Sequence, residues 1–201
     1  GVVWGVTAKA GYVKVFFQSD KKEKVEFLIQ KLESEFEKIT TTDIFSEIHK
    51  TLSDSKKTLG TAESCTGGLI AKKITDLPGA SAYFLGSIVS YHNDIKLNSL
   101  FVKKETLEKF GAVSSETAGE MTVGLEKAIS CDYSMSVTGI AGPDGATPSK
   151  KTGLCYIGVK QKGKAPIVEE FSFPFTRELF RECASNMALF CLYKQFLKRS
   201  L

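Results

Sequence analysis

The stretch between Thr58 and Thr75 constrains the fold more strongly than any other part of the sequence. Thr58–Ala62 reads as a strand, and the turn Glu63-Ser64-Cys65-Thr66 follows it directly. Gly67-Gly68 then opens an apolar helix that extends to about Thr75. A strand that turns into a helix within a few residues is the unit from which helix-covered sheets are built.

Further strands are predicted along the rest of the chain. Ala82–Tyr91 is rich in β-forming residues, and Tyr133–Thr138 reads as another strand. Gly153–Lys160 and Val168–Phe173 alternate apolar and polar residues and are predicted to lie side by side as antiparallel neighbours. The Gly139–Lys151 segment between them concentrates Gly, Pro, Asp and Ser and is predicted to be a loop.

Helices alternate with these strands. Ser114 is suited to cap a helix whose apolar residues share one face: Ala118, Met121, Leu125 and Ala128. Thr176–Leu197 is predicted to close the chain as a long helix. Parallel strands joined by helices, with one late hairpin, indicate an α/β fold, namely a three-layer α/β/α sandwich around a mixed, mostly parallel sheet.

Residues 1–43 are predicted to form a small, partial α+β unit that precedes this main domain. Gly1–Val6 and Tyr12–Phe17 read as strands, and Asp20–Ile39 as a helix with apolar residues at helical spacing: Val25, Leu28, Ile29, Leu32 and Phe36. After the polar Thr40–Asp43, a new helical face begins with Ile44, Phe45, Ile48 and Leu52, so the main domain is predicted over residues 44–201. Because residue 1 is Gly rather than Met and is followed by strand-like sequence, we interpret the chain as the tail of a longer protein.

Composition argues against several classes of protein. The 27 basic and 23 acidic residues are interspersed, so nucleic acid is not expected as a partner. We find no leader and no run of 18 apolar residues, so neither a signal peptide nor a membrane span is predicted. Five cysteines without paired spacing fit a reducing cytoplasm. No His-x-x-x-His, carboxylate cluster or spaced cysteine set indicates a metal, and no cofactor is predicted.

Two polar, Gly-rich loops are predicted to share one edge of the sheet. The Ser64 turn and the Gly139–Lys151 loop each follow a strand, and ligands of open α/β sheets bind beyond the carboxyl ends of the strands. The amides of Cys65, Thr66 and Gly67 precede a helix, where unpaired N–H groups suit an oxyanion or a phosphate. Alternatively, Ser64 and Thr66 only cap the helix and the glycines only permit close packing, and the residues alone do not separate these two interpretations.

Few side chains are available to activate a hydroxyl. His49 lies in a polar stretch of an early helix and is expected to be exposed, so a Ser–His–Asp triad would have to use His92. Tyr91 and Lys96 compete for that role, because burial can lower a lysine pKa from about 10.4 towards roughly 7–8 and make the amine a general base. Since most lysines are solvated surface residues, Lys96 on its own is a minor candidate.

A rival nucleophile and an anion clamp are further hypotheses. Cys65 lies at a helix start, which lowers a thiol pKa, whereas the other cysteines are predicted to be buried, inert thiols. Arg177 and Arg181 are spaced one helical turn apart, so both guanidinium groups could clamp a phosphate or a carboxylate. Exposed helix charges are the alternative for this pair. The Gly139–Gly145 loop either lets a ligand approach its backbone or is only a tight connection.

Several long motifs, taken together, carry a resemblance to a known family. They are Thr61-Ala62-Glu63-Ser64-Cys65-Thr66-Gly67-Gly68, Pro78-Gly79-Ala80-Ser81-Ala82-Tyr83-Phe84, Ser90-Tyr91-His92-Asn93, Gly111-Ala112-Val113-Ser114 and Gly139-Ile140-Ala141-Gly142-Pro143-Asp144-Gly145. In this order, and over about residues 45–198, the chain closely resembles the CinA C-terminal family. So many long matches in sequence order make the resemblance highly specific.

The resemblance implies an enzyme of pyridine nucleotide salvage. Members of the family act as nicotinamide-nucleotide amidases, which use a serine/lysine pair to split nicotinamide mononucleotide into nicotinic acid mononucleotide and ammonia. By resemblance, Ser64 is the nucleophile, Lys96 is the general base and Tyr91 orients the hydrolytic water. The expected substrate contacts are Cys65, Thr66, Gly67, Gly68, Gly139, Ala141, Gly142 and Arg177.

The chain also departs from the family pattern. A Gly-Asp/Asn-Arg sequence is usual before the last helix, whereas here it reads Phe175-Thr176-Arg177, which keeps the arginine and changes its small neighbour. Residues 1–43 resemble the end of the KH-type linker domain of longer CinA proteins but lack its Gly-x-x-Gly clamp, so we expect packing or dimer contact rather than RNA binding.

The expected partners are therefore a pyridine nucleotide substrate and a second copy of the chain in a homodimer. Two alternatives stay open. One is a non-catalytic nucleotide-sensing or competence-associated scaffold module, and the other is an amidase that acts on a different carboxamide.

Overall fold

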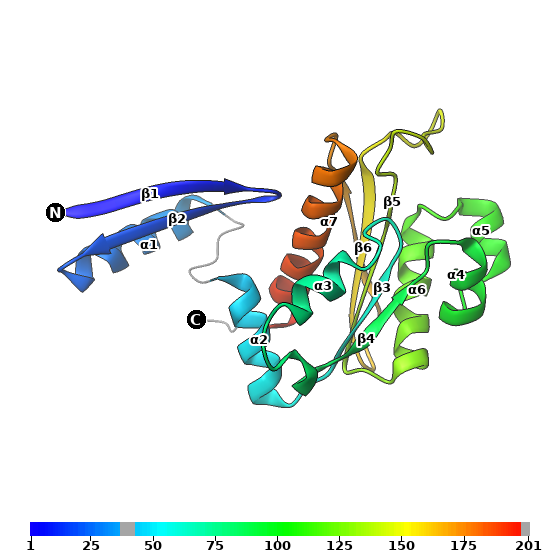
Figure 1. Ribbon diagram of the computed structural model, residues 1–201, viewed down its shortest axis with the longest axis horizontal. Helices are drawn as coiled ribbons and strands as arrows, with labels where there is room; N and C mark the ends of the chain where they lie inside the picture. Colours follow the sequence, from blue (N-terminus) through cyan, green and yellow to red (C-terminus); the bar gives the residue numbers. More distant parts are fainter. Residues whose placement is uncertain (37–42, 198–201) are drawn as a thin grey trace.

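The main part of the protein is a three-layer sandwich around a five-stranded sheet (Figure 1). The structure, a computed structural model, describes residues 1–36 and 43–197. Across the sheet the strands are β4 (Phe84–Val89), β3 (Leu59–Glu63), β5 (Tyr133–Gly139), β6 (Leu154–Gln161) and β7 (Ile167–Ser172). Strand β3 pairs parallel with β4 and β5, whereas β6 pairs antiparallel with β5 and β7. The predicted α/β class and its mixed, mostly parallel sheet are confirmed.

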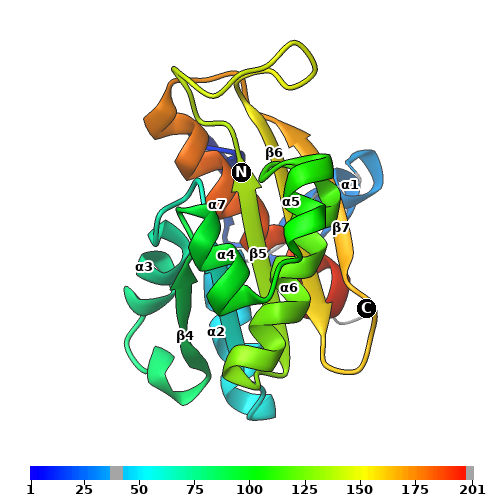
Figure 2. The same cartoon turned by 90° about the vertical axis from the view of Figure 1, so that its right-hand side faces the viewer.

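Helices cover both faces of the sheet. One face carries α2 (Ile44–Ser55), α3 (Leu69–Thr75) and α7 (Arg177–Leu192), and α7 continues as a π-helical turn over Tyr193–Leu197. The other face carries α4 (Asn93–Leu100), α5 (Lys104–Phe110) and α6 (Ser115–Ile129), as Figure 2 shows from the side. A short 3₁₀ turn, Ala80–Ala82, precedes β4.

Each face of the sheet has its own apolar core. On the α7 side, a large cluster includes the fully buried Ile70, Met135 and Phe180. On the α6 side, a smaller cluster is formed by Ala62, Leu100, Val102, Met121 and Leu125. The two clusters pack on opposite faces of the strands that lead into the polar turns. The turns at the sheet edge are therefore anchored on both sides by close-packed side chains.

The central strand β5 is buried along nearly its whole length although four of its residues carry hydroxyls: Tyr133, Ser134, Ser136 and Thr138. Ser136 Oγ donates to the carbonyl of Ala118 at 2.7 Å, and Thr138 Oγ1 donates to the carbonyl of Ala112 at 2.7 Å. These small hydroxyls therefore satisfy backbone carbonyls of α6 and of the loop before it. Hydrogen bonding removes most of the cost of burying Ser136 and Thr138 and attaches the helix layer to the strand, whereas Ser134 Oγ has no partner among the described residues.

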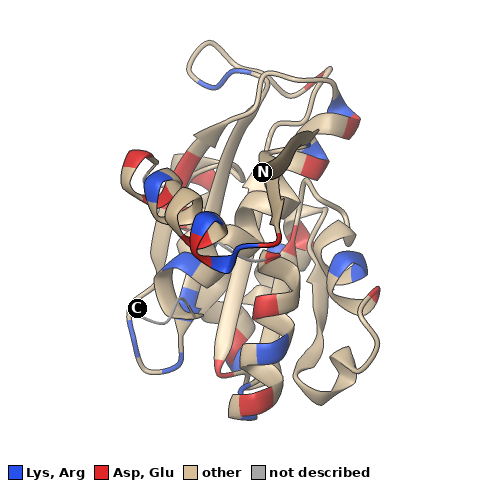
Figure 3. Cartoon of the chain, turned by 90° about the vertical axis from the view of Figure 1, so that its left-hand side faces the viewer, with Lys and Arg blue, Asp and Glu red and all other residues tan. Residues whose placement is uncertain are grey.

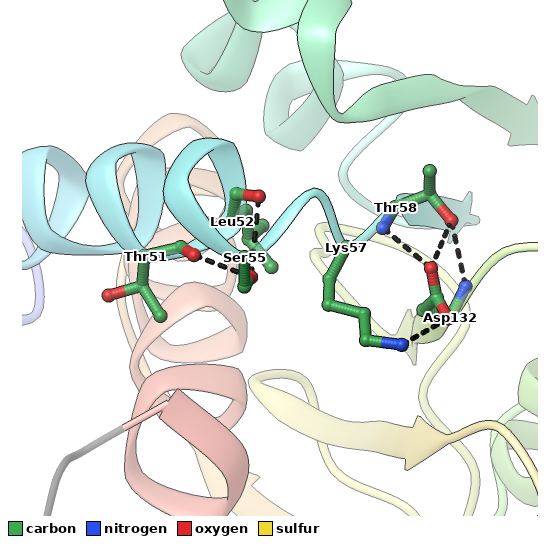
Figure 4. Close-up of polar contacts among 6 residues, drawn as sticks. All are labelled: Thr51, Leu52, Ser55, Lys57, Thr58 and Asp132. Carbon is green, nitrogen blue, oxygen red and sulfur yellow. Dashed lines mark hydrogen bonds and ion pairs between the residues drawn. The ribbon is translucent and has the colours of Figure 1, made fainter.

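The amino-terminal edge of the sheet is held by a carboxylate, shown in Figure 4. Asp132, between α6 and β5, accepts hydrogen bonds from the amide and hydroxyl of Thr58, both at 2.9 Å, and from Lys57 Nζ at 3.1 Å. In return its amide donates to Thr58 Oγ1 at 3.0 Å. The hydrogen bond from the Thr58 amide is the main cause of a lowered pKa of Asp132. This clasp joins the two loops that lead into β3 and β5.

The N-terminal unit is a hairpin, β1 (Val2–Lys9) and β2 (Tyr12–Ser19), with α1 (Lys22–Glu35) beside it. It extends away from the sandwich and reaches it at the hairpin turn (Figure 1), where Asn186 Nδ2 on α7 donates to the carbonyl of Ala10 at 2.6 Å. Basic and acidic residues are interspersed along α1 on the side shown in Figure 3. Among the described residues, no helix is long and apolar enough to cross a lipid bilayer.

Several boundaries and faces differ from the sequence expectations. Two helices, α4 and α5, were not predicted. Ala128 is exposed, because the buried face of α6 ends one turn earlier, at Leu125. The predicted helix Asp20–Ile39 is observed over α1, and Ile39 lies outside the described residues. The boundary between residues 43 and 44 stays a prediction.

Candidate active site

Three strand ends meet at one edge of the sheet. Strand β3 ends at Glu63 and leads into the Ser64 turn, β5 ends at Gly139, and β4 ends at Val89 just before Tyr91. Because these three strands are parallel neighbours, their carboxyl ends lie together. Figure 2 shows the loop after β5 extending beyond this edge. The predicted neighbouring positions of the Ser64 turn and the Gly139 loop are therefore observed.

The structure brings Ser64 and Lys96 into hydrogen-bond contact. Lys96 Nζ lies 3.1 Å from Ser64 Oγ, although the two residues are 32 positions apart in the chain. Ser64 is partly exposed on the turn after β3, whereas the side chain of Lys96, on α4, is only 1% exposed. A partly exposed serine thus faces a buried lysine.

The Lys96 amine is buried without a counter-charge. Burial lowers its pKa from 10.5 to about 8, and the nearby Cys65 acts in the opposite direction. Its other hydrogen bond goes to the carbonyl of Ser90 at 2.5 Å. Within residues 1–36 and 43–197, Lys96 forms no ion pair with a carboxylate. A neutral amine is therefore accessible close to neutral pH, as a general base requires.

The turn after Ser64 leaves two amides free. The Ser64 amide donates to the carbonyl of Val137 at 3.0 Å, and the Gly67 amide donates to the carbonyl of Ser64 at 3.1 Å. The prediction that the Gly67 amide is unpaired was wrong, because the turn closes on itself through that hydrogen bond. Among the described residues, the amides of Cys65 and Thr66 have no acceptor. These two N–H groups are the ones available to an oxyanion beside Ser64 Oγ.

Glu63 is a buried carboxylate in this site that the sequence interpretation did not single out. It is 0% exposed and accepts hydrogen bonds from the amides of Gly68, Ile70 and Ala71 at 3.0, 3.0 and 2.8 Å. An acidic residue five to eight positions before these amides, next to a Gly-Gly helix start, was the available signal. The start of α3 therefore binds an anion from its own chain.

Arg177 and Arg181 bind different parts of the protein, so they do not form the predicted joint binding site for a phosphate or carboxylate. Arg177, at the exposed start of α7, donates from Nη1 to the carbonyl of Gly142 at 2.9 Å and from Nη2 to Tyr91 Oη at 2.6 Å. It thus joins the loops after β4 and β5. Arg181 donates twice to the carbonyl of Thr66, at 3.2 and 2.6 Å, and so holds the Ser64 turn. Of the two arginines, only Arg177 is exposed.

The glycines and alanine predicted to contact substrate lie at the same edge. Gly67 and Gly68 have positive φ angles of 60° and 93°, and Gly68 caps α3, so the turn requires them for its backbone conformation. A side chain on Gly139 would approach the carbonyl oxygen of Leu154 to 2.7 Å. Ala141 and Gly142 are buried in the loop that Arg177 holds.

Two buried hydroxyls beside the pair lack partners. Thr66 Oγ1 and Ser90 Oγ are fully buried and have no hydrogen-bond partner among the described residues. Such groups are uncommon in packed protein, and the described residues include three more away from this site, on His49, Ser134 and Asn186. Thr66 belongs to the turn that offers free amides, and Ser90 supplies the carbonyl that binds Lys96.

The histidines do not join this site, and the thiols are buried. His92 is exposed and caps α4, with its Nδ1 accepting from the Asp94 amide, so it forms no triad with Ser64. His49 is partly buried and its ring packs edge-on against Tyr83 at 5.4 Å, which corrects the expectation of exposure. Hydrogen bonding with Cys65, together with burial, raises the pKa of Cys155. All five thiols are buried, and no group of three metal-binding side chains occurs in the described part of the chain.

The fold and the site define an α/β protein with a hydroxyl–amine pair at the carboxyl edge of its parallel strands. The family model described as CinA C-terminal domain matches residues 41–196, and the chain belongs to this family. A CinA-like protein of Leptospira borgpetersenii serovar Hardjo-bovis is 52% identical over 198 residues, which are 98% of this chain and 47% of that protein. A CinA-like protein of Endomicrobium trichonymphae is 41% identical over 98% of this chain and 48% of its own length. The chain thus spans about half the length of these curated relatives.

Solved structures of the same superfamily share the fold. The competence/damage inducible protein of Agrobacterium tumefaciens superposes with a TM-score of 0.73 at 34% identity, over 78% of this chain and 97% of its own. The competence damage-inducible protein A of Klebsiella pneumoniae gives a TM-score of 0.74 at 27% identity, over the same shares of the two chains.

Proposed function

We propose that this chain is an amidohydrolase that converts nicotinamide mononucleotide to nicotinic acid mononucleotide and ammonia. The observation that carries the proposal is the 3.1 Å contact between Ser64 Oγ and a Lys96 amine whose pKa is lowered to about 8. A buried amine without a carboxylate partner can take a proton from serine, which an exposed lysine at neutral pH cannot do efficiently. The substrate follows from the family resemblance.

In the proposed acylation step, the Ser64 hydroxyl proton passes to Lys96 Nζ while Oγ bonds to the carboxamide carbon. The amides of Cys65 and Thr66 stabilise the negative charge that develops on the carbonyl oxygen. Lys96 then returns the proton to the amide nitrogen, the C–N bond breaks, and ammonia leaves an ester on Ser64. Water attacks this ester with Lys96 again as base, which releases the carboxylate product and restores the Ser64 hydroxyl.

Arg177 supports an anionic substrate in this proposal. Its guanidinium group is exposed at the mouth of the site and is held there by Tyr91 Oη and the carbonyl of Gly142. It can add a charge-assisted contact to a phosphate without moving far. The start of α3 does not serve this purpose, because Glu63 already fills it.

The test is ammonia release from nicotinamide mononucleotide by the purified chain. Ser64→Ala and Lys96→Met are expected to lower kcat by at least about 1,000-fold, since each removes one half of a unit that acts together. Circular dichroism checks that both variants are folded, and mass spectrometry of the quenched wild-type reaction checks for the acyl group on Ser64. A folded Lys96→Met variant with wild-type turnover would refute the assignment.

A second candidate is a nucleotide-sensing module without turnover. The observation that favours it is the departure at Phe175-Thr176, which places an exposed aromatic ring, 48% accessible, two residues before Arg177. A sensor would bind nicotinamide mononucleotide in calorimetry and release no ammonia. The same assay therefore separates the two functions.

A further inference from the structure

The carboxylate of Glu63 is surrounded by donors at the base of the Ser64 turn. Besides the amides of Gly68, Ile70 and Ala71, its Oε1 lies 3.3 Å from Ser87 Oγ and 3.5 Å from Thr61 Oγ1. Carboxylates that accept several hydrogen bonds from N–H groups are strongly held. Since the group has no exposure to solvent, it cannot itself contact a substrate at the mouth of the site.

This carboxylate closes the turn into a ring. The segment from Ser64 to Gly67 lies between Glu63 and the amides that its side chain binds, so both ends of the turn are fixed to one group. Within the ring, the Ser64 carbonyl accepts from the Gly67 amide. In a planar trans peptide the N–H points opposite to the C=O, so the Cys65 N–H is directed away from Gly67.

Glu63 also fixes the residue that binds the amine. Its backbone carbonyl accepts a hydrogen bond from the Ser90 amide at 2.8 Å. The Ser90 carbonyl in turn accepts from Lys96 Nζ. One residue therefore connects the turn that carries Ser64 with the loop that holds Lys96, through its side chain on one side and its backbone on the other.

We propose that Glu63 is a positioning residue whose carboxylate holds the Cys65 and Thr66 amides in the geometry of an oxyanion hole. The proposal rests on the serine/lysine chemistry proposed above. A glutamine at this position has nearly the same shape but presents an NH₂ group to donors that need an acceptor. The Glu63→Gln turn must then rearrange, and the two free amides lose their alignment.

The first experiment compares the kinetics of Glu63→Gln with those of wild type. We expect kcat to fall on the order of 100-fold, because misaligned oxyanion donors affect mainly the transition state, with KM changed by less than about threefold. The midpoint of the pH profile should not move, since Glu63 is not among the groups that shift the pKa of Lys96. Asp132→Asn is the matched control, because Asp132 also clasps backbone and hydroxyl donors but lies at the opposite edge of the sheet. It should keep wild-type kcat.

A second readout reports on the oxyanion hole directly. Pyridine-3-boronic acid can form a B–O bond with Ser64 Oγ while the hydroxyl proton passes to Lys96, which gives a tetrahedral anion without a leaving group. Its affinity should weaken in Glu63→Gln by about the same factor as kcat/KM, whereas the affinity for nicotinic acid mononucleotide should stay within about threefold. A folded Glu63→Gln variant with unchanged boronate affinity would overturn the proposal, whatever its kcat.

Three further outcomes also bear on the two proposals. If Glu63→Gln does not fold, Glu63→Asp keeps the charge on a shorter side chain, and wild-type kcat and boronate affinity in that variant would overturn the proposal. If wild type forms the boronate adduct on Ser64 but releases no ammonia from nicotinamide mononucleotide, the proposed substrate is wrong, and the adduct's affinity still tests Glu63. If wild type neither forms the adduct nor releases ammonia, both proposals are wrong; if it releases ammonia without forming the adduct, an unchanged kcat of Glu63→Gln overturns the role of Glu63.

Discussion

At the scale of single residues, the site depends on the environment of one amine. Lys96 is nearly fully buried, bonds to a serine hydroxyl and a backbone carbonyl, and forms no ion pair with any described residue. Desolvation disfavours its charged form, and no neighbouring carboxylate restores it. The same side chain on the surface would keep its ordinary pKa and could not act as a base near neutral pH.

The pH profile of turnover is the corresponding prediction. Lys96 must be neutral to accept a proton, so kcat/KM should rise with pH through a midpoint near the lowered pKa of about 8 and level off above it. One pH unit below the midpoint, only about a tenth of the enzyme is in the active form. Initial rates of ammonia release between pH 6 and about 10 measure this. A profile that is flat across pH 8, or that falls through it, would show that another group is the base.

Individual site residues could be identified from the sequence where a local sequence pattern marks them. Ser64 stands out because a polar turn between a buried strand and a Gly-Gly helix start is visible in the sequence. Lys96 does not stand out, since its burial depends on how α4 packs, and only the family resemblance singled it out. Glu63 was missed and the Gly67 amide was assigned wrongly, because both depend on which groups the folded turn pairs with each other.

At the scale of elements, the close packing of α6 on its neighbours holds the layer that carries Lys96. A Cβ on Gly124 would lie 1.6 Å from the carbonyl oxygen of Leu100, at the end of α4, so the two helices meet with no room for a side chain. Gly119, on the same helix, has only ordinary contacts, with Val168 Cγ2 at 3.6 Å and Pro166 Cγ at 3.9 Å. Replacement of glycine by alanine should therefore destabilise the fold at position 124 and stabilise it at position 119.

Gly124→Ala is expected to lower the free energy of unfolding by at least about 2 kcal/mol, because steric overlap with backbone outweighs the gain in helix propensity. Gly119→Ala should raise it by about 0.5–1 kcal/mol, because only the propensity term acts there. Urea titrations followed by circular dichroism measure both. If Gly124→Ala proves as stable as Gly119→Ala, the α4–α6 packing described above is wrong.

The long and strongly patterned elements were predicted well, whereas α4 and α5 were not. Helix α4 carries Ile95, Leu97 and Leu100 on no single face, with Ile95 39% exposed and Leu100 buried. Helical periodicity is the main sequence signal, so a short helix without an apolar stripe gives none. Both helices pack against α6, and α4 is also capped by His92, whereas α5 has no side-chain cap.

At the scale of the whole molecule, two units meet over a small contact. The hairpin turn touches α7 through the Asn186–Ala10 hydrogen bond, and Tyr12 packs edge-on against Phe45 at 6.4 Å. Every residue assigned to the candidate site belongs to the sandwich. Among the described residues before Asp43, none belongs to the candidate site, and only the partly buried Ala10 packs against an apolar core cluster.

A chain shortened to begin at Asp43 should accordingly fold and keep its activity. We expect kcat/KM to stay within about threefold of that of the full chain, because the sandwich has its own core and its own site. Ammonia release and thermal unfolding of the two chains measure this. A shortened chain that folds but loses turnover would mean that the N-terminal unit supports the site through contacts with α7.

The sequence alone determined the order of the strands and helices with strong periodicity, the α/β class, and the polar turn that carries Ser64. Those features are local, since hydrophobic period, glycine and capping residues act within a few positions of each other. Only the tertiary structure decided which amides stay free, that Glu63 closes the turn, and that the Lys96 amine is buried beside the Ser64 hydroxyl. These properties depend on distances and solvent exclusion between segments far apart in the chain, which no local pattern records.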